Sequence, residues 1–232
     1  MPGTFTISLD FELLWGIFDK VGTKYKAEYF ENTRRVIPQM LAYFAAAELE
    51  ATWATVGMLF AENEEEWAAY SPTYLPSYRQ RKLSAYAWAK DHGIRPEVHF
   101  APELIQQILD TPGQELGSHS FAHYYTLMRG QSPEQFREDL KATQRIALDK
   151  FNTKLESLVF PRNHINELYL EICLEEGYHQ VRGNPKKHPH SCPGNLQLCR
   201  CKICQHLRDY PSRILKVFSL VFCTHFIKNP PK

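Results

Sequence analysis

Residues 4–10 read TFTISLD, and this stretch gives the first indication of the fold. Apolar and hydroxyl side chains alternate along it, which predicts a strand that leads into a functional loop. The stretch ends on Asp10, and Glu12 follows two positions later. If the strand extends that far, both carboxylates leave the same face and can reach one point. A solvated strand end would show the same pair of acids.

Beyond this strand, extended and helical patterns alternate along the chain. From about Asn32, apolar residues recur every three to four positions, which predicts a helix with Pro38 in its first turns. Residues 132–135 (SPEQ) have the pattern of a helix N-terminus with a capping box. Further strands are expected at 52–57, 115–118, 157–160 and 178–182. This alternation is typical of a mostly parallel sheet, either open or closed as a barrel.

The length and composition fit one large domain. The chain has 232 residues, of which 44% are hydrophobic and 23% charged, so wholesale disorder is excluded. It contains no apolar run long enough to span a bilayer. The residues that follow Met1 lack the basic region and apolar stretch of a secretory signal, so we expect a cytoplasmic protein.

The last 50 residues differ in composition from the rest. Residues 183–232 hold nine of the 27 basic residues, one of the 26 acidic residues and five of the six cysteines. We therefore expect one domain over 1–184 and a basic Cys/His/Pro-rich tail over 185–232 that is not part of the native fold. Our preferred interpretation is a shifted reading frame that begins near residues 183–185.

Two other interpretations of the tail remain open. Four soft ligands could in principle hold one zinc ion, although their spacing is unlike that of common zinc modules. They are Cys199, Cys201, Cys204 and His206. A basic tail could also bind nucleic acid. Because it has no recognisable reading element, we expect no nucleic-acid partner.

Two further motifs carry side chains suited to chemistry. The four-residue spacing of His119 and His123 places both imidazoles on one side of a helical turn, where they can bind one divalent metal together with a carboxylate. Two unrelated helix histidines would have the same spacing. Arg162 follows the strand at 157–160 and could hold a carboxylate by paired hydrogen bonds, or could be a surface cation beside the helix cap Asn163.

Four stretches, in this order, resemble the polysaccharide deacetylase family, which is carbohydrate esterase family 4 or the NodB homology domain. They are 8–13 (SLDFEL), 51–57 (ATWATVG), 119–123 (HSFAH) and 160–163 (FPRN). The resemblance extends from residue 4 to about 184. It implies an α/β fold, a distorted (β/α) barrel that we expect to be incomplete in this chain. It also implies metal-dependent removal of an acetyl group from an N-acetylated saccharide of the bacterial cell-envelope or exopolysaccharide kind.

The resemblance also implies a role for each matching residue. Asp10 becomes the general base, and Arg162 orients it. Glu12, His119 and His123 become the ligands of a divalent cation, for which zinc is our first choice. Such a cation polarises the acetamide carbonyl and activates a water molecule, which Asp10 deprotonates.

One expected part of the family pattern is missing. The family supplies a general acid from a histidine in a late L-x-I-H-like strand, and no such motif follows Arg182. General acid catalysis is worth roughly 10² to 10⁴ in rate, so we expect impaired activity. The alternatives are a hydrolase of another non-peptide C–N bond, such as a cyclic amide, and a catalytically inactive truncated remnant.

Overall fold

The computed structural model describes residues 6–21 and 23–183. Its centre is a five-stranded parallel sheet in the order β1-β2-β3-β4-β5, so the predicted α/β class and parallel arrangement are confirmed. The strands are β1 (Ile7–Phe11), β2 (Ala51–Thr55), β3 (Gln114–Ser118), β4 (Ser157–Leu158) and β5 (Gln180–Val181).

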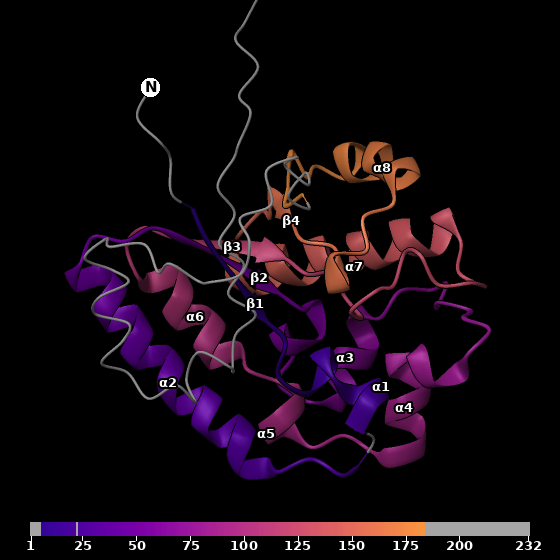
Figure 1. Ribbon diagram of the computed structural model, residues 1–232, viewed down its shortest axis with the longest axis horizontal. Coiled ribbons are helices and arrows are strands. Elements are labelled where there is room, and N and C mark those ends of the chain that lie inside the picture. The colour runs from indigo at the N-terminus through magenta and orange to yellow at the C-terminus, as the bar shows by residue number, and fades with distance from the viewer. Residues whose placement is uncertain (1–5, 22, 184–232) are drawn as a thin grey trace, which may run out of the picture.

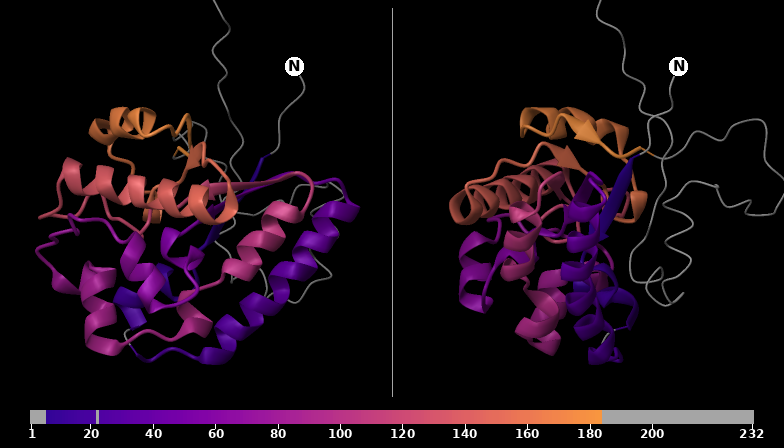
Figure 2. Two further views of the ribbon diagram at one scale, coloured as in Figure 1. Left: turned by 180° about the vertical axis from the view of Figure 1, so that it is seen from behind. Right: turned by 90° about the vertical axis from the view of Figure 1, so that its left-hand side faces the viewer.

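Helices connect and flank these strands. The α-helices are α1 (Phe18–Val21), α2 (Ala27–Ala46), α3 (Glu64–Tyr70), α4 (Ala85–His92), α5 (Pro96–His99), α6 (Pro102–Asp110), α7 (Pro133–Phe151) and α8 (Leu170–Glu175). Short 3₁₀ turns lie at η1 (Leu13–Gly16), η2 (Gly57–Phe60), η3 (Arg81–Leu83), η4 (Pro161–Asn163) and η5 (Glu167–Tyr169). Helices α2 and α6 lie side by side on one flank of the sheet, while α7 and α8 lie together on another (Figures 1 and 2). No helix in the described part of the chain is long and apolar enough to cross a membrane.

Two helices test the capping and proline predictions. Ser132 caps α7, and it and Gln135 form the reciprocal hydrogen bonds of a capping box, as predicted. Helix α2 begins at Ala27, earlier than predicted, so Pro38 lies in its interior and not in its first turns. A buried apolar stripe that includes Ile37 and Leu41 outweighs the local cost of the proline.

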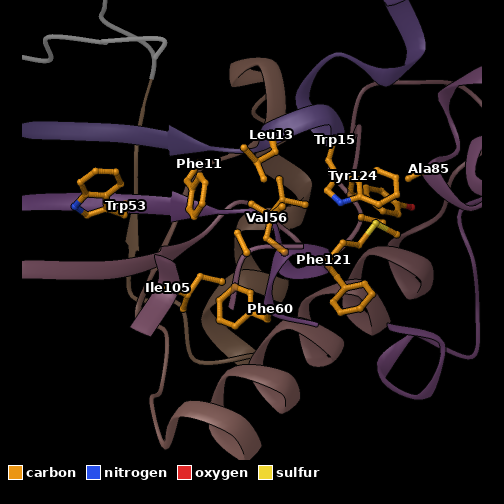
Figure 3. Packing of buried hydrophobic residues seen from close by; sticks show 14 of the residues in the cluster. Phe11, Leu13, Trp15, Trp53, Val56, Phe60, Ala85, Ile105, Phe121 and Tyr124 are labelled. Atoms are coloured by element: carbon orange, nitrogen blue, oxygen red, sulfur yellow. The ribbon is translucent and has the colours of Figure 1, made fainter. Parts of the chain in front are cut away.

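The core lies between the sheet and the surrounding helices. Leu9 and Phe11 of β1 are buried, and Phe11 lies close to Val56 in the packed cluster of Figure 3. Because side chains alternate along a strand, Ser8 and Asp10 leave the opposite face of β1. One face of this strand therefore packs in the core, and the other face carries polar side chains.

The sheet curls into a half-barrel. Arg182, which directly follows β5 at one edge of the sheet, donates hydrogen bonds to Ser8 and Asp10 of β1 at the other edge. Within the described residues β1 and β5 are not paired with each other, so the barrel is partial there, as expected. The division at residue 184 stays a prediction. The predictions for the tail lie outside the described residues. They include the possible zinc ligands Cys199, Cys201, Cys204 and His206.

Candidate metal centre

The register of the sheet brings the candidate ligands to one edge. Phe11, Thr55 and Ser118 are aligned across β1, β2 and β3, and these strands run in the same direction. The residues that follow the first and third of them are Glu12 and His119. Their proximity therefore follows from strand pairing, despite more than a hundred intervening residues. The carboxyl ends of parallel strands are the usual place for a site.

Glu12, His119 and His123 converge at this edge. Glu12 Oε1 lies 2.9 Å from His119 Nε2 and 3.1 Å from His123 Nε2. One potential ligand atom from each residue lies within 4.8 Å of the others. The three residues that the sequence suggested as metal ligands therefore lie together. Two nitrogens and one carboxylate oxygen form a donor set that leaves a position for water on a zinc-type cation.

His119 supplies a test of whether the residues fit a cation. Its imidazole is fully buried, and neither of its ring nitrogens has a hydrogen-bond partner in the described part of the chain. Although its Nε2 approaches Glu12, the contact lacks hydrogen-bond geometry. A buried nitrogen without a partner is costly unless something else binds it. The cluster therefore fits a divalent cation between the imidazoles and the carboxylate.

The charge states of the cluster also suit a cation. Burial opposes ionisation of Glu12, but the adjacent imidazoles of His123 and His119 outweigh it and hold the pKa of Glu12 well below its usual range. Burial lowers the pKa of His123. An ionised carboxylate and a neutral imidazole are the forms that bind metal.

Gly16 makes room for the Glu12 carboxylate. A Cβ atom built on Gly16 would lie 1.8 Å from Glu12 Oε2. Any other residue at this position would displace the carboxylate from its present place. The absence of a side chain at Gly16 is therefore part of the site, although it contributes no ligand atom.

Asp139 of α7 holds the turn that carries the two histidines. Its buried carboxylate accepts hydrogen bonds from the backbone N–H groups of Phe121, at 2.6 Å, and Ala122, at 3.0 Å. Burial raises the pKa of Asp139 to about 7, although these two hydrogen bonds oppose the rise. Asp139 was not predicted from the sequence. An acid on the buried stripe of α7, beside Phe136 and Leu140, was the available signal.

Unusual backbone conformations surround the candidate site. Of the seven non-glycine residues with positive φ in the described part of the chain, five lie in its loops. They are Leu13, Ser120, His123, Arg162 and Asn163. Left-handed conformations cost free energy in most residues and tend to gather at functional sites. This grouping independently marks the same edge of the sheet.

Asp10 is held by Arg182, a residue that was not predicted from the sequence to be part of the site. Arg182 Nη1 lies 2.7 Å from Asp10 Oδ1, and Nη2 donates to Oδ2 at 2.9 Å. Arg182 also donates to Ser8 Oγ at 3.0 Å and to Asn163 Oδ1 at 3.2 Å. Both side chains of the ion pair are largely buried. The signal that could have indicated Arg182 was its place at the end of the last predicted strand.

Arg162 has a different partner from the one expected. The expected contact with Asp10 is not formed, because Arg162 Nη2 donates to both carboxylate oxygens of Asp19, at 2.6 and 2.7 Å. Arg162 has a φ of 57° within η4, and its guanidinium lies 4.3 Å from the centre of the Tyr125 ring. The arginine that contacts Asp10 is the one that follows β5.

Comparison with protein families gives one match that covers most of the chain. The family described as polysaccharide deacetylase matches residues 18–181. This range includes His119 and His123 and begins after Asp10 and Glu12. No curated protein matches the chain at a significant level.

Solved structures with a similar chain path include several described as family 4 carbohydrate esterases. One is a pseudoenzyme of this family from Bacillus anthracis, with 16% identity over 75% of this chain and 41% of that chain, at a TM-score of 0.42. Another, from Streptomyces lividans in complex with acetate, has 13% identity over 78% and 62%, at 0.44. A putative polysaccharide deacetylase from Mycobacterium smegmatis has 14% identity over 76% and 49%, at 0.49. The chain spans about two fifths of the length of the Bacillus protein.

Proposed function

Because the chain belongs to the polysaccharide deacetylase family, we propose that it is a metal-dependent hydrolase that removes N-acetyl groups from a poly- or oligosaccharide. The observation that carries this proposal is the convergence of Glu12, His119 and His123. We propose these three side chains as ligands of a divalent cation, with zinc as the first choice. The bound cation would supply a Lewis acid for the acetamide carbonyl and lower the pKa of water.

The remaining chemistry belongs to Asp10 and Arg182. In the proposed mechanism the Asp10 carboxylate accepts the proton of the attacking water. The paired contacts from Arg182 fix the orientation of that carboxylate. The Arg182 guanidinium is itself held by hydrogen bonds to Ser8 of β1 and to Asn163 of η4. The orientation of the Asp10 carboxylate therefore depends on residues from two separate parts of the chain. Arg182 thus takes the positioning role that the sequence had suggested for Arg162.

Acetate release from N-acetylglucosamine oligomers tests the proposal. We expect slow release that stops on addition of a chelator and returns with Zn²⁺. Asp10→Asn should abolish release and retain one metal ion per chain, because it leaves the three ligands in place. Ring opening of a cyclic ureide without acetate release would instead assign the chain to another C–N hydrolase.

Metal content separates an active enzyme from a remnant. Elemental analysis should give one divalent ion per chain, and none in the His119→Ala/His123→Ala double variant. Full occupancy in that variant would contradict the ligand assignment. A folded chain that holds its metal and releases no acetate from any oligomer would identify a non-catalytic member of the family.

A further inference from the structure

We propose that Tyr125, Asp19 and Arg162 form a relay that fixes the ring orientation and tautomer of His123. The inference rests on the metal site of the proposed function and adds to it three residues that are not ligands. It explains why Arg162 and Asp19 are paired beside the site without contacting the base Asp10.

The first link joins His123 to Tyr125. While Nε2 of His123 faces Glu12 at 3.1 Å, Nδ1 lies 3.0 Å from the Tyr125 hydroxyl. The two rings are nearly perpendicular, at 86°, with their centroids 5.1 Å apart. Both side chains are buried, so water does not compete for this contact. The hydroxyl therefore holds the nitrogen that faces away from the carboxylate.

The second link joins Tyr125 to Arg162 and, through it, to Asp19. Burial raises the pKa of Tyr125, and the charge of the nearby Asp19 raises it further. Asp19 is itself largely buried and is held by Arg162, whose guanidinium also covers the Tyr125 ring at 4.3 Å. The phenol is thus fixed at its hydroxyl and over its face. A cation stacked on an aromatic ring adds to this hold.

The direction of the hydrogen bonds follows from the chemistry of the imidazole. A histidine that binds a cation through Nε2 carries its proton on Nδ1. That N–H then donates to the Tyr125 oxygen, while the guanidinium of Arg162, held by Asp19, fixes the ring from its face. Groups of this kind behind a metal-binding histidine commonly set its tautomer and orientation.

The relay serves only one of the two histidines. Nδ1 of His119 is buried and has no hydrogen-bond partner among the described residues, whereas Nδ1 of His123 has the Tyr125 hydroxyl. The ring of His123 is therefore fixed through its far nitrogen, whereas no such hydrogen bond holds the ring of His119 within the described residues. Loss of the relay should weaken one ligand and leave the other in place.

Metal affinity of the full chain tests the relay. We would measure Co²⁺ uptake by visible absorption and Zn²⁺ affinity by competition with a chromophoric chelator. Tyr125→Phe removes only the hydroxyl and should weaken binding about 10- to 100-fold, as loss of such a partner typically does. The control is Tyr124→Phe. It removes a neighbouring buried hydroxyl that bonds to Gln131 and Ser132, and it should leave affinity unchanged.

A double variant distinguishes a relay from separate structural effects. Asp19→Asn should also weaken metal binding, and adding it to Tyr125→Phe should cause no further loss, because Asp19 and Arg162 act on His123 only through the Tyr125 hydroxyl. Independent, multiplying losses would overturn the relay, as would unchanged affinity in Tyr125→Phe. If the unchanged protein takes up no Co²⁺, the metal site fails and the relay with it. Normal uptake without any effect of Tyr125→Phe removes the relay alone.

Discussion

Arg182 and Asp10 are separated by 172 positions in the chain and form a paired ion contact, at 2.7 and 2.9 Å, across the mouth of the half-barrel. Both side chains are largely buried, so their mutual orientation is tightly constrained. The contact joins β1 to the residue that follows β5. It fixes the orientation of the Asp10 carboxylate, the proposed general base.

Arg182→Lys keeps the positive charge and loses the paired geometry. We expect acetate release to fall about 10- to 100-fold, because a misplaced base is costly in rate. Metal content should stay at one ion per chain, since the ligands are untouched. The control is Arg137→Lys, which alters an arginine paired with Glu175 and Glu176 on the outside of the fold. Equal activity in the two variants would show that Arg182 does not position the base.

Gly16→Ala tests the space reserved for the Glu12 carboxylate. The new methyl group would lie 1.8 Å from Oε2 and must push this flexible side chain aside. We expect metal affinity to fall at least about 10-fold, on the scale of a lost supporting contact, with little change in the unfolding midpoint of the metal-free protein. Gly183→Ala is the matched control, because a Cβ there meets nothing within 4 Å. Chelator competition for Zn²⁺ measures both variants.

Asp139 should make stability depend on pH. Its pKa rises from the usual 3.8 to about 7 in the folded state, mainly through burial. Between these values the unfolded chain releases the proton and the folded chain retains it, so its contribution is complete below pH 3.8 and declines as pH rises to 7. The difference in unfolding free energy between the unchanged protein and Asp139→Asn should shrink over this window by a few kcal/mol. Urea titrations with chelator present, at several pH values, measure it, and a constant difference would contradict the expectation.

Metal removal should lower thermal stability. A ligand that binds only the folded state stabilises it by about 2.7 kcal/mol at a hundredfold excess over its Kd. Chelator should therefore lower the unfolding midpoint of the unchanged protein, and added Zn²⁺ should restore it. The same additions should have no effect on His119→Ala/His123→Ala. A midpoint in that variant that still responds to Zn²⁺ would indicate a second site.

The sequence predicted those features that depend on local pattern and on strand direction. The parallel strands follow from alternating patterns, and the meeting of Glu12 with His119 follows because parallel strands end at one edge. Side-chain partners that depend on sheet curvature could not be inferred. Arg182 contacts Asp10 only because the sheet curls. Arg162 has a left-handed backbone conformation that the local sequence pattern does not predict. Asp139 was missed for a related reason, since its partners are backbone groups of a distant turn.

The distance along the chain between Asp10 and Arg182 also orders events during synthesis. Glu12, His119 and His123 are synthesised well before residue 182. A growing chain therefore contains every proposed ligand before Arg182, the partner of Asp10, has been added. Any product that stops short of residue 182 would contain all three proposed ligands but would lack the arginine that holds Asp10.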